Sequence, residues 1–422
     1  MLRRDFLRSV AAIGLWPLAK DIQSPPPEPI RWPAPTDPNF WRWVRAQLDI
    51  PKGETYFNTA TLGAVPRPVM DSVAAHMRDI EKTIAHFDYR PEHPEYIAGY
   101  RKQEELRAKV APLFNAAAEE IALVQNATMG TNFIANGIDL QPGDDVLMTD
   151  QEHVGNRGPW ELREKRQGIV LKRLPIGTPP ADPDAIVRIF AEAITPRTRA
   201  IDVPHITSKL GIVMPVVRIA ELARAKNIFF LVDGAQAIGH IPIDVKAIGC
   251  DAYTTSPHKW LLAPPGNGLL YVRADRQKDV WATLASASWN DYDSKDGAYR
   301  LMQFGTANSS LLVGLDAAID FCQHVGHERI QQRVMELSNR LRSGLQKIDR
   351  AKIYSPTHSA LACGIVTWGL DGVKGPQLMD ELWNRRKIRV RSVDENMVRQ
   401  STHFYNSPEE IDTTLEIARA LL

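Results

Sequence analysis

Three segments of this sequence place reactive side chains directly after a short apolar run. In "AYTTSPHKW" the run is followed by Ser256, His258 and Lys259. In "FFLVDGAQ" it ends at Asp233, and in "VLMTDQEH" it is followed by His153. A buried amine or carboxylate is costly unless it meets an opposite charge or serves a chemical purpose. The pattern therefore predicts a reaction site that contains an amine, a carboxylate and an imidazole.

A fourth segment, "ALVQNATMGTNF", passes from a strand pattern through Asn126 into a helix pattern. Free amides at a helix start, beside the Thr128 hydroxyl, form an anion site, although Asn and Thr also act there simply as caps. One cofactor needs all four segments: pyridoxal phosphate requires an amine for its aldehyde, a carboxylate for its ring nitrogen, a flat group over its ring and a phosphate cradle. Lys259 is then expected to hold it as an aldimine and to carry protons to and from the substrate Cα. Asp233, with an ordinary pKa of about 3.9, is expected to be ionised and to keep the ring nitrogen protonated.

The elements that must position these residues alternate between strand and helix patterns. Helix patterns lie between several strands, and one begins with Asp182 as its cap and Pro183 in its first position. After about residue 310, long amphipathic helices and short strands predict a smaller α+β domain. The alternation predicts a mostly parallel α/β sheet flanked by helices, with ligands beyond the carboxyl ends of its strands. The apolar runs typical of buried parallel strands are 121–124, 146–149, 169–174, 200–203, 228–232, 252–255 and 269–272.

From about Tyr56 to the C-terminus these motifs resemble the class V aminotransferase family of pyridoxal-phosphate enzymes, which includes cysteine desulfurases and isopenicillin N epimerase-like proteins. The resemblance implies fold type I, with a large domain holding a mostly parallel seven-stranded sheet and a smaller α+β domain. It also implies a homodimer. In "DGAQ" it implies that Asp233 binds the ring nitrogen and that Gln236 reaches the ring oxygen. In "EH" it implies that His153 stacks on the ring.

The same resemblance assigns residues to the phosphate and to the substrate. In "SPHK" it implies that Ser256 and His258 bind the phosphate, and "NATMG" supplies Thr128 and the Met129 amide. In "FGTANSS" it implies that Thr306 reaches the phosphate bound to the neighbouring subunit. In "VRQSTHFYNSPEEID" it implies that Arg399 holds the substrate carboxylate, since the guanidinium fork suits a carboxylate. Asn58 is assigned as a second substrate contact.

The reaction itself is less specified than the cofactor. Desulfurases of the family place a nucleophilic cysteine shortly after an arginine that matches Arg391, and residues 391–396 contain no cysteine, so desulfurase activity is not expected. The segment "HITS" resembles the epimerase-like branch, although its His205 is equally compatible with a satisfied residue at a strand end. We expect removal of the Cα proton from an amino acid or an amino-acid-containing metabolite, with epimerisation or transamination as the outcome. A β-elimination lyase and a non-catalytic binding domain are the alternatives. An epimerase needs a second acid or base opposite Lys259, and the sequence does not identify it.

The N-terminus resembles a twin-arginine export signal over residues 1–20. It carries Arg3 and Arg4 before "DFLR", followed by an apolar run too short to span a membrane. Residues 21–50 are rich in proline and are expected to form an extended linker. These features predict an exported, periplasmic enzyme without a stable membrane span. Export also raises a variant of the function, the tailoring of a secreted peptide such as a siderophore.

Composition limits the partners. The chain has 422 residues, 44% of them hydrophobic, and a formal net charge of +1, so no basic field indicates nucleic acid and the expected partner is a small amino-acid-type substrate. Its three cysteines are far apart and lack CxxC spacing, which indicates neither a metal site nor a disulfide framework. We expect a large cofactor-binding domain at 51–310 and a small domain at 311–422.

Overall fold

A computed structural model describes residues 32–86, 100–180, 182–286, 289–291 and 297–421. The expected export signal at 1–20 and the first part of the expected linker lie outside these residues. The described residues from 33 onward belong to one compact unit.

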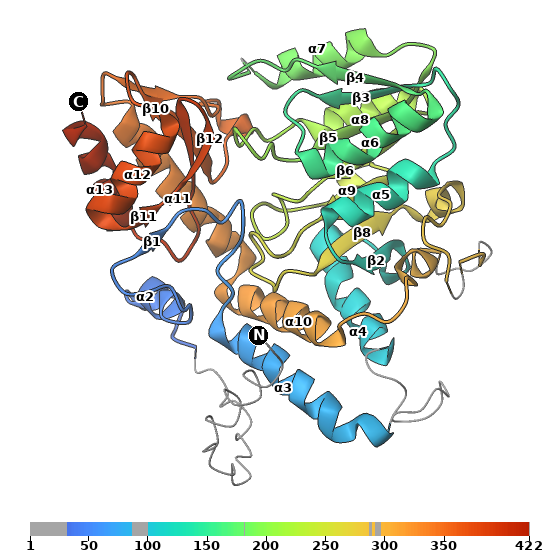
Figure 1. Cartoon of the computed structure of the whole chain (residues 1–422), viewed down its shortest axis with the longest axis horizontal. Helices are drawn as coiled ribbons and strands as arrows, with labels where there is room; N and C mark the ends of the chain where they lie inside the picture. The colour runs from blue at the N-terminus through green and yellow to red at the C-terminus, as the bar shows by residue number, and fades with distance from the viewer. Residues whose placement is uncertain (1–31, 87–99, 181, 287–288, 292–296, 422) are drawn as a thin grey trace, which may run out of the picture. The chain divides into compact units, whose positions relative to one another are not determined.

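A seven-stranded sheet forms the centre of the large part of the fold (Figure 1). All seven predicted apolar runs are strands, which confirms this element of the fold. The sheet is mixed, because β8 runs antiparallel to both of its neighbours while the adjacent pairs from β7 to β4 are parallel. In spatial order the strands are β2 (Ile121–Val124), β8 (Gly268–Val272), β7 (Ala252–Thr255), β6 (Phe229–Asp233), β5 (Thr198–Pro204), β3 (Asp145–Thr149) and β4 (Val170–Leu174).

Helices flank this sheet, and several begin with a side chain that accepts a hydrogen bond from a free backbone amide. Asp182 caps its helix as predicted, with Oδ1 accepting from the Ala185 amide at 2.7 Å. Asn126 and His153 cap α5 and α6 in the same way, at the carboxyl edge of the sheet. The helices of this part are α4 (Tyr100–Val110), α5 (Ala127–Gly137), α6 (Val154–Gln167), α7 (Pro183–Ala193), α8 (Val216–Ala225) and α9 (Val245–Ile248).

The C-terminal part is the predicted smaller α+β unit. Its antiparallel sheet has the order β12 (Arg391–Asp394), β13 (Met397–Ser401), β10 (Ile365–Leu370) and β9 (Ala351–Ile353). Buried apolar side chains such as Trp368 and Leu382 form a core between this sheet and its helices. A capping box of Ser407 and Glu410 starts the last helix. The helices are α11 (His327–Leu345), α12 (Gly375–Arg386) and α13 (Pro408–Ala420).

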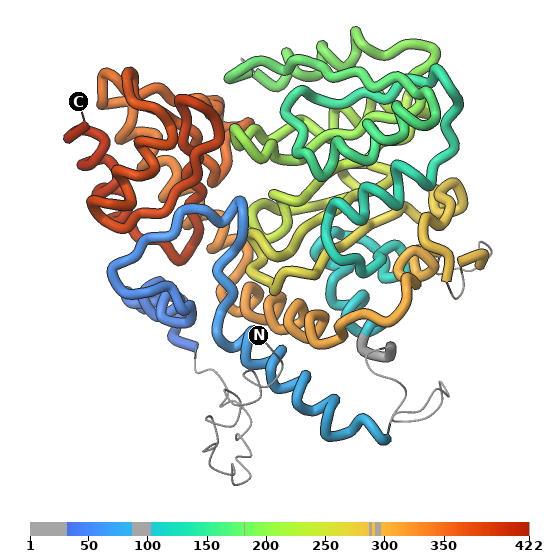
Figure 2. Tube along the Cα trace, viewed as in Figure 1, coloured from blue at the N-terminus to red at the C-terminus, as the bar shows by residue number. Residues whose placement is uncertain are grey.

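The N-terminal boundaries differ from the prediction. Strand β1 (Thr55–Tyr56) pairs in parallel with β11 (Ile388–Arg389), and Phe57 lies in the C-terminal core, so the chain near residue 51 begins in the small unit. Figure 2 shows this blue segment running beside the red C-terminal part. The expected extended linker also ends before residue 50, because 40–45 form helix α2 (Phe40–Arg45) with Phe40 buried. The physical reason is that apolar side chains interrupt the proline pattern and can be buried.

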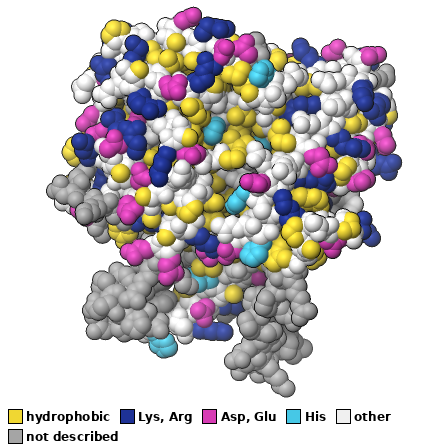
Figure 3. All heavy atoms as spheres, turned by 180° about the vertical axis from the view of Figure 1, so that it is seen from behind, with side chains coloured by type: hydrophobic (Ala, Val, Ile, Leu, Met, Phe, Trp, Pro, Cys, Tyr) yellow, Lys and Arg dark blue, Asp and Glu magenta, His cyan; other side chains and the backbone are white. Residues whose placement is uncertain are grey.

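Two long helices connect the parts. Helix α3 (Arg67–Thr83) packs along α10 (Ser309–Val325). Short 3-10 helices occur at 84–86, 111–114, 118–120, 274–279, 299–302 and 359–361. Among the described residues, no helix is both long enough and apolar enough to cross a bilayer. Charges of both signs are mixed over the face seen in Figure 3.

Candidate active site

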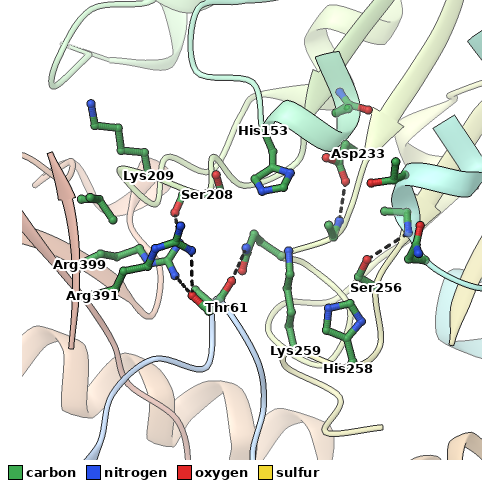
Figure 4. A pocket seen from close by; sticks show the side chains of 18 of the residues that line it. Thr61, His153, Ser208, Lys209, Asp233, Ser256, His258, Lys259, Arg391 and Arg399 are labelled. Atoms are coloured by element: carbon green, nitrogen blue, oxygen red, sulfur yellow. Dashed lines mark hydrogen bonds between the residues drawn. The ribbon is translucent and has the colours of Figure 1, made fainter. Parts of the chain in front are cut away.

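Most of the residues expected at the site line one cavity of about 490 Å³ at the carboxyl ends of the parallel strands. Strand β6 ends at Asp233, β7 leads into Ser256, and β3 leads to His153, so the sheet itself brings these side chains to one edge. Figure 4 shows Asp233, Ser256 and His258 on one side of the cavity and a group of cationic side chains on the other.

Lys259 lines this cavity from a tight loop after β7. The loop is held by close backbone contacts: the Gly63 amide donates to the His258 carbonyl at 2.8 Å. A Cβ at Gly63 would lie 2.1 Å from the Lys259 carbonyl oxygen, so only glycine allows this approach. Burial lowers the pKa of the Lys259 amine to about 8, against the opposing attraction of Asp233, and Arg399 also contributes to the lowering.

This lowered pKa predicts how fast the protein takes up its carbonyl cofactor after the cofactor has been removed. Attack on an aldehyde needs the neutral amine, so the rate of regain of visible absorbance should rise about tenfold per pH unit below pH 8 and level off above it. An unperturbed lysine would continue to accelerate toward pH 10.5. Stopped-flow absorbance between pH 6 and 10 measures the profile. A rate that still climbs about tenfold per unit above pH 9 would contradict the prediction.

Asp233 is a buried carboxylate with 7% of its surface exposed. Its Oδ1 accepts a hydrogen bond from the Ala235 amide at 2.8 Å. Among the described residues, no cationic side chain forms an ion pair with it. Burial raises its pKa above the ordinary value assumed from the sequence, although Lys259 and His153 oppose that effect. A carboxylate in this state fits a cationic ligand group such as a protonated ring nitrogen.

The anion cradle forms where α5 begins. The Ser256 hydroxyl oxygen accepts from the Ala127 amide at 3.1 Å, so its own proton remains available to a ligand. Thr128 lines the cavity, and Gly155 approaches it so closely that a Cβ there would lie 2.3 Å from Thr128 Oγ1. The Met129 amide, expected as a phosphate donor, instead donates to Asn126 Oδ1 at 2.8 Å. The Asn126 helix cap therefore uses the Met129 amide that was expected to bind the phosphate.

The two histidines of the cavity are both held neutral. His258 lines the cradle, its Nδ1 has no partner among the described residues, and burial lowers its pKa to about 4. His153 Nδ1 accepts from the Gly155 amide at 3.1 Å, which leaves the ring proton on Nε2. Burial lowers the pKa of His153, and the nearby Lys259 adds to this. Figure 4 shows the His153 ring and the Lys259 amine pointing toward each other into the cavity.

Gln236 lines the cavity, but most of its amide is already engaged. Its Nε2 donates to the Ala60 carbonyl at 2.9 Å, and its Oε1 accepts from Trp260 Nε1 at 2.7 Å. One N–H remains for a ligand oxygen. Trp260, the residue after Lys259, stacks on His240 at a centroid distance of 3.6 Å. The hydrogen bond from Trp260 to Gln236 therefore also helps to hold the Lys259 loop in place.

Arg399 lies on β13 at the cavity, where it is buried and 3% exposed. Its Nη1 donates to the Ser208 carbonyl at 2.7 Å, and its Nη2 donates to Thr61 Oγ1 at 2.6 Å and to Asn58 Oδ1 at 3.2 Å. Burial lowers the pKa of Arg399 to about 9. Asn58 does not line the cavity, and the structure places it behind Arg399 as a group that orients the guanidinium.

Two further assignments fall outside the cavity. Thr306 is exposed and does not line it within this chain. His205, for which two interpretations were open, is buried with Nδ1 2.7 Å from the Tyr253 hydroxyl, as a satisfied strand-end residue would be.

The structure adds a buried acid network that the sequence did not reveal. Asn156 Nδ2 donates to Glu152 Oε2 at 2.9 Å and to Asp202 Oδ1 at 3.0 Å, and Trp160 Nε1 donates to Asp202 Oδ2 at 2.6 Å. Burial raises the pKa of Glu152 well above its usual range and that of Asp202 to about 8. The signal in the sequence was the polar pair Glu152 and Asn156 beside His153, but its partner Asp202 lies on another strand.

A family model that matches most of the chain shows to which family it belongs. The family model for aminotransferase class V matches residues 56–414. The chain belongs to the class V aminotransferase family. Isopenicillin N epimerase of Amycolatopsis lactamdurans is 30% identical over 400 residues, which cover 90% of this chain and 98% of that protein. A probable cysteine desulfurase of Methanothermobacter thermautotrophicus is 30% identical over 409 residues, covering 90% and 99%.

Solved structures of similar proteins share the fold of this chain. A lysine-to-alanine mutant of C-DES, with glycine covalently linked to its PLP cofactor, has a TM-score of 0.77 at 25% identity and covers 89% of this chain and 98% of its own. The apo cysteine desulfurase of Thermococcus onnurineus NA1 has a TM-score of 0.78 at 24% identity, covering 93% and 98%. These neighbours confirm fold type I.

This class V enzyme is dependent on pyridoxal phosphate. Its own residues fit the cofactor. One cavity contains Asp233, which has no cationic partner among the described residues, Ser256 with a free hydroxyl proton, and Lys259 with a lowered pKa. Asp233 would hold the ring nitrogen, Ser256, Thr128 and His258 the phosphate, and Lys259 the aldehyde carbon.

Proposed function

We propose that this class V enzyme removes the Cα proton of an amino acid or an amino-acid-containing metabolite, with epimerisation or transamination as the outcome. The observation that carries the proposal is that the Lys259 amine and the Arg399 guanidinium line one cavity. When bound, pyridoxal phosphate supplies an electron sink for the electron pair left at Cα. Arg399 binds the substrate carboxylate and so orients Cα. Lys259 Nζ accepts the proton from Cα and returns it, and its lowered pKa suits both steps.

The cysteines support this proposal over sulfur transfer to a protein thiol. All three are buried, and none lines the cavity. Cys363 Sγ donates to the Gly211 carbonyl at 3.2 Å, and burial raises its pKa to about 11. Cys322 Sγ donates to the Leu261 carbonyl at 3.5 Å. A β-elimination lyase remains the second candidate, because elimination needs no thiol on the enzyme.

One experiment separates these outcomes. The holoenzyme is incubated with a panel of L- and D-amino acids in heavy water, and the mixtures are followed by NMR and chiral chromatography. We expect deuterium at Cα of at least one amino acid. Appearance of the other enantiomer indicates epimerisation, a keto acid with bound amine indicates transamination, and pyruvate with a released β-substituent indicates elimination. No Cα exchange with any free or peptide-linked amino acid would refute the proposal.

We also propose that the enzyme is exported to the periplasm by the twin-arginine route and tailors a secreted peptide, such as a siderophore. The support is the Arg3–Arg4 pair followed by "DFLR". That route carries folded proteins, which suits a cofactor acquired in the cytoplasm. Replacing both Arg3 and Arg4 with lysine should retain the enzyme in the cytoplasm, while Arg8→Lys should leave export intact. Cell fractionation measures this, and unchanged export of the double variant would contradict the route.

A homodimer is the assembly we propose. Thr306 and its neighbours at 305–308 are exposed and away from the cavity of their own chain, so a phosphate contact by Thr306 requires a second copy. Sedimentation of the purified enzyme as a monomer at micromolar concentration would argue against it.

A further inference from the structure

Two arginines face the cavity from directly opposite positions of an antiparallel pair. Arg391 on β12 is the cross-strand partner of Arg399 on β13, and both line the cavity. Arg391 Nη1 donates to Thr61 Oγ1 at 3.1 Å, the same oxygen that Arg399 contacts. Like charges directly opposite each other destabilise a sheet. Such a pair is expected where a ligand, rather than the fold, supplies the compensating charge.

Within the described part of the chain, no carboxylate compensates this pair. Neither arginine forms an ion pair there, and the only acidic side chain lining the cavity is Asp233, on the other side (Figure 4). Lys209 adds a third cation to this side, but its Nζ is balanced by Asp394 Oδ2 at 2.5 Å. The excess positive charge therefore belongs to the arginines.

The two guanidiniums differ in the hydrogen bonds that they leave free. Arg399 already donates to Ser208, Asn58 and Thr61, and both hydrogens of its Nη2 are used. Arg391 donates one of its five N–H groups, to Thr61, and is exposed toward the cavity. Arg391 thus holds the larger unused donor set and can take a carboxylate in bidentate fashion.

We propose that Arg391 binds a second acidic group of the substrate, in addition to the carboxylate at Arg399, so that the substrate class is a dianionic amino acid. The proposal rests on the proposed function for the carboxylate at Arg399. One α-carboxylate leaves one of the two guanidinium charges unmatched, whereas two acidic groups match both. A carboxylate bridging both arginines is the competing arrangement, and it predicts no preference for a second acid.

The test compares isosteric ligands that differ in one charge. The visible spectrum and the thermal unfolding of the holoenzyme are titrated with L-glutamate and L-glutamine, and with glutarate and its monoamide glutaramate, at constant ionic strength. We expect the acid of each pair to bind roughly 10- to 100-fold more tightly than the amide, as a charge-assisted bidentate pair would give. Equal binding within both pairs would overturn the proposal.

Arginine variants show which residue is responsible for the preference for the acid over the amide. Arg391→Gln should weaken glutamate and glutarate to the level of their amides and leave the amides unchanged. Arg399→Gln should weaken all four ligands. Arg389→Gln is the matched control, because Arg389 lies over the Trp383 ring at 4.0 Å and does not line the cavity, so it should preserve the preference. Equal weakening of acids and amides by Arg391→Gln would show one shared carboxylate and overturn the proposal.

The two proposals fail separately. Glutarate and glutaramate have no α-amino group and test the anion site without turnover. A glutarate preference that depends on Arg391, found together with no Cα exchange, would refute the proposed function alone. Cα exchange without any acid preference would refute the second acidic site alone.

Discussion

Replacing Lys259 with alanine is expected to abolish the visible absorption band of the purified enzyme and to lower Cα exchange by about 10³-fold or more. The reason is that the Lys259 amine lines the cavity, and its pKa of about 8 suits it to act both as the nucleophile for the cofactor aldehyde and as the proton carrier. Absorbance of the purified variant and NMR in heavy water measure the two effects. Loss of both together is the expected result.

The matched control is Lys209→Ala. Lys209 lines the same cavity, but its amine is paired with Asp394. The Lys209→Ala variant should therefore keep the visible absorption band. An unchanged spectrum of the Lys259 variant would refute the role of that lysine. Loss of the band in both variants would show that the change reflects general damage to the cavity.

Replacing Asp233 with asparagine is expected to lower Cα exchange by about 10²- to 10³-fold while the visible band is retained. Asparagine preserves the shape and can still accept from the Ala235 amide, but it removes the buried negative charge that would hold a cationic ring nitrogen. The attraction of Asp233 raises the pKa of Lys259, so the variant should also move the midpoint of cofactor uptake below pH 8. Both the exchange rate and the uptake profile are measurable on one preparation.

Asp150→Asn provides the control for this substitution. Asp150 also follows a parallel strand, but it is exposed and lies outside the cavity, so its variant should exchange at the wild-type rate. An Asp233 variant with full activity, or one with its uptake midpoint moved to higher pH, would contradict the proposed charge.

The sequence alone predicted the strands and the residues that follow them. Each of the seven runs is short, apolar and bounded by turn residues, and a parallel sheet buries both faces, so burial itself produces the pattern. Because the carboxyl ends of parallel strands share one edge, the sequence alone places Asp233, Ser256 and His153 together. The helix cap at Asp182 could also be predicted, because it depends on residues only three positions apart in the sequence.

Other features depend on contacts between distant segments, and the sequence could not supply them. The segment at 55–57 reads as the start of the large domain, but it pairs with β11 more than 300 residues later. The orienting role of Asn58 arises because Arg399 reaches it across the cavity edge. The network that joins Glu152, Asn156 and Asp202 links the loop after β3, helix α6 and strand β5.

The amino-acid order by itself determined the strands, the helix starts and the set of reactive side chains at the carboxyl edge, because these follow from local burial and capping. The tertiary structure alone decided the electrostatics. Burial raised the pKa of Asp233 and lowered that of Lys259, and the register of β12 against β13 set Arg391 opposite Arg399. Desolvation and cross-strand charge depend on what surrounds a residue in space, and the order of residues along the chain does not specify those surroundings.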